Sequence, residues 1–262
     1  MTRPQLTNRY NLPRPLVRAL ERDPYNRGDC DISVTQLIQP PRKVELERQH
    51  TSEMVEDASD RLYALYGQIA HTILERAADS SIVEKRLYAK CLGWQISGQV
   101  DLIEDLVTDY KLTTVWSVRD GHKQEYIDQL RILRWLCHMN EIEVKGLQNV
   151  LLFRDWRPSE SLKYDWYPPK VLVMPVEMRD FEFDNEFTKA RVYAHQTARG
   201  YAAFPRKLPD CSDDERWQGR RCEKYCGAYP WCSQANPNLA PGSPKPNSVR
   251  QPCESNRAKG AD

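Results

Sequence analysis

Two acidic residues and a lysine that together could hydrolyse a phosphodiester bond lie close in this chain, Asp101, Asp109 and Lys111. Carboxylate oxygens are the ligands that hard divalent cations such as Mg²⁺ prefer, and such a cation can activate water for attack on phosphorus. A neighbouring lysine can orient that water or stabilise charge on the phosphate. These residue types therefore predict a hydrolytic metal site, although an isolated Asp-x-Lys triplet is also common on solvated strand edges.

The spacing of these residues predicts how their strands must pair. Side chains alternate between the two faces of a strand, so Asp109 and Lys111 share a face. A two-residue turn at Glu104–Asp105 would place Asp101 opposite Thr108 and leave the two acids on opposite faces. A connection one residue longer pairs Asp101 with Asp109 and brings all three side chains to one face. We therefore expect an odd-length loop or a bulge between the two strands.

A helix expected over residues 57–77 supplies a further candidate ligand, His71. Its apolar residues recur every three or four positions and predict a buried stripe of Leu62, Leu65, Ile69 and Ile73. Gly67, His71 and Glu75 lie on the opposite face, where a solvated His–Glu pair is the ordinary interpretation. Beside the acidic strands, a neutral imidazole that binds the metal is the more economical interpretation.

Gln129 is the last residue that we assign to this site. It lies on a helix expected near 123–138, beside an apolar stripe of Tyr126, Leu130, Leu133 and Cys137. Its amide could bind the substrate or orient Lys111. An ordinary glutamine at the boundary of the core is nearly as good an interpretation.

Length, charge and hydropathy limit the class of protein. A chain of 262 residues can form one large domain with appendages. Its formal net charge of +1 gives no global attraction for nucleic acid, so a DNA-binding surface must be a local basic groove. No apolar run is long enough to span a membrane, and residues 1–13 lack the order of a signal peptide. We expect a soluble cytoplasmic protein with no membrane partner, whose eight cysteines are better candidates for metal ligands than for disulfides.

The predicted elements follow the order helix, three strands, helix, strand, which is typical of an α/β fold. A short strand or turn at 31–37 and a charged helix after Pro40-Pro41 precede them. Strands are expected near 82–92, 94–103, 106–117, 147–153 and 170–178, and the last helix near 184–203. We divide the chain into an N-terminal arm, an α/β core, a cysteine-rich segment and a disordered tail, at residues 1–30, 31–205, 206–234 and 235–262.

Half of the cysteines fall in one segment that is also rich in aromatic and basic residues, Cys211, Cys222, Cys226 and Cys232. Four thiolates in a segment without its own core predict a structural metal centre. Spacings of three and five residues are looser than the C-x2-C knuckle of zinc ribbons, which favours an iron–sulfur cluster and leaves zinc open. Free structural cysteines are the alternative. Cys91 and Cys137 are expected to be small core hydrophobes, and Cys30 and Cys253 receive no role.

Taken together, these motifs resemble the PD-(D/E)XK nuclease superfamily, in its RecB-like branch, over residues 31–234. The helical stretch GQIAHTILER is similar to the G-x-x-x-H helix of that branch, and QLRILRW to its Q-x-x-x-x-x-[YW] helix. SGQVD and TDYKLTTVWSV are similar to its GxxD and D-x-K strands. DISVTQLIQPPR, DYKLTTVWSV and LPDCSDDERWQGRRCEKYCGAYPWCSQ are further similar to a phage-encoded group of such nucleases.

The resemblance implies a restriction-endonuclease-like core and a role for each candidate residue. Mg²⁺ or Mn²⁺ would be bound by His71, Asp101, Asp109 and the carbonyl of Tyr110. Lys111 would be the catalytic lysine, and Gln129 would support it.

The cysteine pattern departs from this family. Iron–sulfur nucleases of the branch usually take one cysteine from before the core and three from its C-terminal side. At the expected upstream position this chain has Gln39-Pro40-Pro41. Either Cys211 or Cys30 would have to supply the missing ligand, so both a [4Fe–4S] cluster and zinc remain open.

The function implied is that of a metal-dependent exonuclease that degrades DNA from an end. The basic and aromatic residues of the cysteine segment suit phosphates and stacked bases, and this segment could shape a channel for single-stranded DNA. The phage likeness implies a role in recombination or end processing in the host cytoplasm, beside a single-strand annealing protein. A homo-oligomer is a further expectation. A structure-specific endonuclease and a non-catalytic DNA-binding subunit on the same fold are the alternatives.

Overall fold

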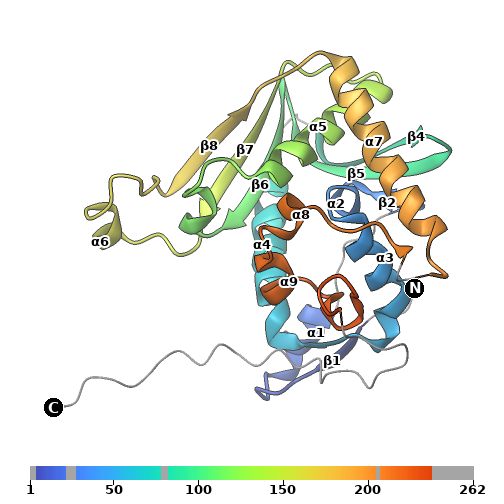
Figure 1. Cartoon of the computed structure of the whole chain (residues 1–262). Coiled ribbons are helices and arrows are strands. Elements are labelled where there is room, and N and C mark those ends of the chain that lie inside the picture. Colours follow the sequence, from blue (N-terminus) through green and yellow to red (C-terminus); the bar gives the residue numbers. More distant parts are fainter. Residues whose placement is uncertain (1–3, 22–27, 78–81, 205–206, 238–262) are drawn as a thin grey trace.

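A computed structural model describes residues 4–21, 28–77, 82–204 and 207–237 (Figure 1). The fold is mixed α/β, as predicted. Its main sheet has the strand order β2-β5-β6-β7-β8, and β4 also pairs with β5. The strands are β2 (Ile32–Ser33), β4 (Ile82–Cys91), β5 (Trp94–Ile103), β6 (Leu106–Thr113), β7 (Gly146–Phe153) and β8 (Val171–Val176). A separate parallel pair joins β1 (Gln5–Thr7) and β3 (Val55–Asp57).

The predicted helices are present as α3, α4, α5 and α7, with boundaries that differ by a few residues, and the other α-helices were not predicted. The α-helices are α1 (Arg14–Glu21), α2 (Val34–Leu37), α3 (Pro41–His50), α4 (Leu62–Ala77), α5 (Gln124–Met139), α6 (Pro158–Ser161), α7 (Phe181–Gly200), α8 (Asp213–Arg216) and α9 (Arg220–Lys224). Short 3-10 helices are η1 (Thr51–Glu53), η2 (Ala58–Arg61), η3 (Val115–Val118) and η5 (Tyr229–Trp231). The strand predicted over 106–117 therefore ends at Thr113 and continues as η3.

Two connections set the positions of the central strands. Cys91 pairs with Trp94, so β4 and β5 form a hairpin across two residues, Leu92 and Gly93. Both of these residues have positive φ, at 47° and 81°, as a two-residue hairpin turn requires. The β6–α5–β7 unit then crosses over the sheet, because β6 and β7 are parallel and cannot be joined by a hairpin.

The core lies between the sheet and the helices α2, α5 and α7. Helix α5 buries its apolar stripe completely, including Leu130, Leu133 and Leu136. It packs so closely on β5 that a Cβ atom at Gly98 would lie 2.6 Å from Leu136 and 2.8 Å from Leu133. The glycine of the SGQVD motif therefore allows the close approach that places α5 beside the strand of Asp101.

The packing of α4 corrects a prediction. Ile69 and Ile73, which the apolar stripe assigned to the core, are 49% and 59% exposed, and no residue of α4 is fully buried. The half-buried Gln68 and His71 line the cleft toward the sheet instead. The physical reason is that this part of the sheet presents carboxylates, and polar side chains can pair with them whereas isoleucine cannot.

The remaining sequence predictions concern the ends of the chain and membranes. Among the described helices, none is long and apolar enough to cross a bilayer. The four-part division of the chain stays a prediction. Apart from its first three residues, the predicted disordered tail at 235–262 lies outside the described residues, as does Cys253.

Candidate active site

A cleft of about 520 Å³ is enclosed by α2, α4, α5 and the strands β4, β5 and β6. The structure brings five of the predicted site residues to its wall, namely His71, Asp101, Asp109, Lys111 and Gln129. Tyr110 lines a smaller neighbouring pocket with His71 and Asp101. Residues from four separate elements of the predicted core therefore meet in one place.

The pairing of β5 with β6 explains how the two acids meet. Ile103 pairs with Val107 and Leu102 with Thr108, so three residues form the connection and the same register places Asp101 opposite Asp109. The predicted odd-length connection is confirmed. Beyond this point the backbone ladder stops, and the backbone N–H of Tyr110 donates to the Asp101 carboxylate at 2.8 Å.

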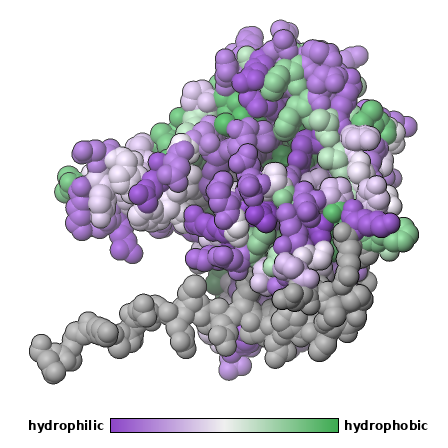
Figure 2. Space-filling model, viewed as in Figure 1, coloured by the Kyte–Doolittle hydropathy of each residue, from purple (hydrophilic) through white to green (hydrophobic). Residues whose placement is uncertain are grey.

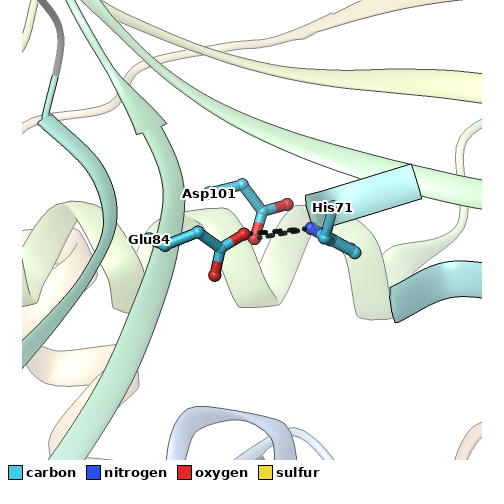
Figure 3. A group of neighbouring side chains, drawn as sticks. All are labelled: His71, Glu84 and Asp101. Carbon is cyan, nitrogen blue, oxygen red and sulfur yellow. Dashed lines mark ion pairs between the residues drawn. The ribbon is translucent and has the colours of Figure 1, made fainter. Parts of the chain in front are cut away.

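One side of the cleft consists of three titratable side chains that face one another (Figure 3). The His71 Nδ1 atom lies 3.3 Å from a Glu84 carboxylate oxygen and 3.6 Å from an Asp101 oxygen. Within the described part of the chain, this is the only group of three His, Cys, Asp or Glu residues whose ligand atoms lie within 4.8 Å of one another. Two hard oxygen ligands and one imidazole at this spacing suit a divalent cation.

Sequence reasoning missed Glu84. The β4–β5 hairpin register, counted back from its two-residue turn, places Glu84 opposite Asp101. The dipeptide Leu92-Gly93 between two predicted strands was the signal that could have revealed this pairing. Glu84 also has a positive φ of 48° within a strand, and its carboxylate accepts a hydrogen bond from Gln99. Left-handed backbone at a residue other than glycine is unfavourable and is concentrated at functional sites.

The other side of the cleft is a hydrogen-bonded network around the buried Asp109. Lys111 Nζ and Gln129 Nε2 donate to one carboxylate oxygen at 2.9 and 3.0 Å. The amide of Asn149 donates to the other oxygen at 2.8 Å. Lys111 also donates to the side-chain oxygen of Gln129 at 2.9 Å. His122 Nε2 lies 2.7 Å from the side-chain oxygen Oδ1 of Asn149. Asn149 is fully buried in β7, in the register position beside Asp109, and sequence reasoning did not select it.

The electrostatics differ between the two sides. Burial and the neighbouring Asp109 carboxylate raise the pKa of Asp101 to about 7. A hydrogen bond to Glu84 and the nearby carboxylates outweigh burial and raise the pKa of His71. Burial lowers the pKa of Lys111, but the adjacent Asp109 carboxylate more than offsets it, so the pKa is raised overall. Lys111 is therefore cationic at neutral pH. Asp101 is partly protonated at that pH and would release its proton on binding a metal ion.

The four clustered cysteines line one pocket that lies apart from the cleft. The pocket has a volume of only about 20 Å³ and is also lined by Pro40 and Arg42. Since the close group described above contains no cysteine, no three of the four sulfurs lie within 4.8 Å of one another. Tetrahedral zinc, with Zn–S bonds of about 2.3 Å, would require sulfurs about 3.8 Å apart. Burial raises the pKa of Cys211 to about 12 and that of Cys226 to about 11.

The two candidates for the fourth cysteine, Cys211 and Cys30, lie in different places. Cys211 lines the pocket together with Cys222, Cys226 and Cys232. Cys30 instead accepts a hydrogen bond from Ser97 at 3.2 Å and is not part of that pocket. Cys91 and Cys137 are buried in the main core, as predicted.

Buried cations attach the cysteine segment to the rest of the fold. The guanidinium of Arg42 on α3 donates to the Cys232 sulfur at 3.3 Å, to the Leu208 carbonyl at 2.5 Å and to Ser233 at 2.7 Å. Arg221 on α9 lies over the ring of Trp217 and donates to Gln39 at 2.8 Å. Figure 1 shows α9 and α3 in the lower half of the view, with α8 above α9.

Comparisons with known proteins give structural matches only, because no family model and no curated protein matches the chain. The structure is similar to that of SSO0001, with a TM-score of 0.52 and 17% identity, over 81% of this chain and 90% of that one. LHK-Exo in complex with dAMP matches with a TM-score of 0.41 and 11% identity, over 71% and 93% of the two chains. The alkaline exonuclease LHK-Exo from Laribacter hongkongensis matches with a TM-score of 0.40 and 10% identity, over 65% and 90%. The match to SSO0001 shows a shared fold, and the other two are too distant to carry an argument.

Proposed function

We propose that this protein is a divalent-metal-dependent deoxyribonuclease that acts as an exonuclease on DNA ends. The observation that carries the proposal is the cleft in which Asp101, Asp109 and Lys111 meet His71 and Glu84. The GxxD, D-x-K and G-x-x-x-H motifs of RecB-like PD-(D/E)XK nucleases would bring together Asp101, Asp109, Lys111 and His71, and Glu84 joins them from outside these motifs.

The donor set fits Mg²⁺ or Mn²⁺. His71, Glu84 and Asp101 would hold the cation, with Asp109 and the Tyr110 carbonyl as further ligands. Mg²⁺ binds its ligands at about 2.0–2.1 Å, which spans ligand atoms up to about 4.2 Å apart. The His71–Glu84 and His71–Asp101 distances are within that span. Bound there, the cation supplies polarisation of the phosphate and acidification of water.

Lys111 is placed to act on the reacting groups. An ammonium has three N–H donors, and two of them are used by Asp109 and Gln129. The third can donate to the attacking water or to a phosphate oxygen, where negative charge builds up as the bond to phosphorus forms. Asp109 and Gln129 hold the ammonium in position while this occurs. We expect a 5′-phosphate and a 3′-hydroxyl as products.

The test is digestion of end-labelled linear DNA beside covalently closed circular DNA, with Mg²⁺ or Mn²⁺. Lys111→Ala is the inactive variant, and Lys145→Ala, an exposed lysine that pairs with Asp105 at 2.9 Å, is the matched control. Loss of linear DNA alone supports the exonuclease, and loss of both substrates supports an endonuclease. If the wild-type protein leaves both intact, the chain is a non-catalytic DNA-binding subunit and the proposal fails.

We further propose that Cys211, Cys222, Cys226 and Cys232 hold a [4Fe–4S] cluster, with zinc as the alternative. All four cysteines line one pocket, and the wide spacing of their sulfurs supports the larger group. When bound, the group would attach the C-terminal segment to α3 and contribute folding free energy. Protein purified without oxygen should be brown and contain iron, whereas a colourless preparation with stoichiometric zinc supports the alternative. Cys226→Ser should be less stable or less soluble than wild type in either case.

The biological setting of the proposal rests on the sequence resemblance alone. We place the enzyme in phage DNA recombination, repair or end processing in the host cytoplasm, beside a single-strand annealing protein. Co-purification of such a protein with the tagged chain, and a native mass larger than one chain, would test the partner and the homo-oligomer respectively.

A further inference from the structure

An exposed aromatic surface projects from the sheet beyond the cleft. It is formed by residues 154–170, which connect β7 to β8 and contain α6, together with Trp116 and Arg119 of the segment after β6. We call it the aromatic arm. Figure 1 shows α6 and its loops reaching away from the body at the left, and in Figure 2 they form a separate lobe.

The aromatic rings of the arm form a connected cluster. Trp166 lies 5.2 Å from Trp116, 6.0 Å from Tyr164 and 5.7 Å from Tyr167, measured between ring centroids. Trp116 is 59% exposed and Tyr164 is 46% exposed. Large aromatic side chains that are this exposed and grouped together mark binding surfaces rather than core.

The Arg and Lys side chains of this surface lie over aromatic rings rather than beside acidic side chains. The guanidinium of Arg119 is 5.6 Å from the Trp116 ring, and that of Arg154 is 4.0 Å from the Tyr63 ring. Lys170 is 5.0 Å from the Trp156 ring. Among the described residues, no carboxylate forms an ion pair with any of these three side chains. Their charge is therefore available to a phosphate backbone.

The arm is connected to the candidate active site. Trp116 follows directly after β6, the strand that carries Asp109 and Lys111. Lys111 Nζ lies 5.5 Å from the ring of Tyr126, which packs on the same apolar cluster as Trp156 at the base of the arm. At no more than about 3.3 Å per residue, Trp116 lies at most about 17 Å along the chain from Lys111. A strand whose end occupies the cleft would reach the arm within a few nucleotides.

We propose that the aromatic arm binds a single-stranded segment of the DNA substrate and stacks unpaired bases on Trp116, Tyr164 and Trp166. Phosphates lie against Arg119 and Arg154. The assignment rests on the proposed nuclease function for the identity of the substrate. Stacking needs bases that are not paired, so the arm favours single strands over duplex.

Binding without hydrolysis tests this inference. Anisotropy of a labelled single strand of about 12 nucleotides, a length suited to such platforms, is measured in EDTA and compared with a blunt duplex of the same sequence. Trp116→Ala should weaken single-strand binding about 5- to 100-fold, and Trp116→Phe should retain most of it. Duplex binding should change less than about twofold, because paired bases cannot stack on the arm. Tyr193→Ala, which removes an equally exposed tyrosine from α7, should have no effect.

The outcomes separate the arm from the nuclease proposal. If Trp116→Ala and Tyr164→Ala both bind the single strand as wild type does, or lose duplex and single strand equally, the stacking assignment is wrong. No binding of DNA by the wild-type protein also overturns it and leaves the arm as a surface for a protein partner. A chain that binds single strands through Trp116 but does not hydrolyse linear DNA keeps the arm and loses the nuclease function.

Discussion

The two sides of the cleft are held in different ways. Around Asp109, each carboxylate oxygen already accepts a hydrogen bond from a side chain, and Asn149 behind it is fully buried. Around His71, three titratable groups face one another, and the helix that carries His71 has no fully buried residue. The Asp109 side is therefore formed by folding, whereas in the proposed site a cation would complete the His71 side.

The largest effect should come from Asp101→Asn. Loss of this ligand should reduce hydrolysis about 10³-fold or more, because a bound cation contributes several kcal/mol to the barrier. The metal-free protein should nevertheless become more stable at about pH 8, by up to about 4 kcal/mol, because the folded pKa of about 7 lies above the usual 3.8. Folding therefore disfavours the charged form of the Asp101 carboxylate. This cost to the free energy of unfolding is absent below the pKa of Asp101 in the unfolded chain, where the carboxyl is protonated in both states. Denaturant unfolding in EDTA at about pH 8 and about pH 4 checks it.

A decrease in both hydrolysis and stability at pH 8 would contradict this interpretation. It would mean that Asp101 is stabilised by folding, as Asp109 is, and that the two sides of the cleft do not differ. Lys145→Ala serves again as the control, since its exposed ion pair should leave both quantities unchanged.

Metal affinity should depend on pH. A cation must displace the proton of Asp101, whose pKa is about 7, and that of His71, whose pKa is raised by Glu84. Affinity for Mn²⁺ should therefore fall about tenfold or more between about pH 8 and about pH 6. Calorimetry in two buffers with different ionisation heats should detect the released protons. If the affinity for Mn²⁺ does not change across this range, Asp101 and His71 are not the ligands of the metal.

On the Asp109 side, Asn149→Ala should destabilise the protein itself. It leaves a buried carboxylate oxygen without its donor, which costs about 1–3 kcal/mol. Misplacement of Asp109 should also reduce activity about 10- to 100-fold. Gln148→Ala is the matched control, because the neighbouring Gln148 points to the other face and donates to Thr108. Equal stability of the two variants would show that the Asp109 network is not preformed by folding.

Sequence patterns could predict the strand part of the site better than the helix part. Alternation and register place Asp101, Asp109 and Lys111 together, because a strand has only two faces and its pairing follows from connection length. Prediction of Glu84 as a site residue requires the register of a second hairpin. Prediction of Asn149 requires knowing that β7 lies beside β6. Both depend on pairings between separate segments, which local periodicity does not contain.

The apolar stripe of α4 shows why periodicity alone was insufficient. It identifies which residues share a face, but not which face the rest of the molecule covers. Here His71 and Gln68 of α4 meet the carboxylates of the sheet, and Ile69 and Ile73 of the apolar stripe are exposed while Leu62 and Leu65 are half-buried. The carboxylates of the sheet therefore determine which face of α4 is turned inward. Burial of the apolar stripe alone would have given the opposite orientation of the helix.

The smallest effect should accordingly come from this stripe. Ile73→Ala should change the free energy of unfolding by less than about 0.5 kcal/mol, because the side chain is 59% exposed. Leu130→Ala on α5, where the stripe is fully buried, should cost about 2–5 kcal/mol. Denaturant unfolding of the two variants, in EDTA and with saturating Mn²⁺, measures both. If Ile73→Ala costs more than about 2 kcal/mol, α4 packs by its apolar face, and His71 is not directed at Glu84 and Asp101.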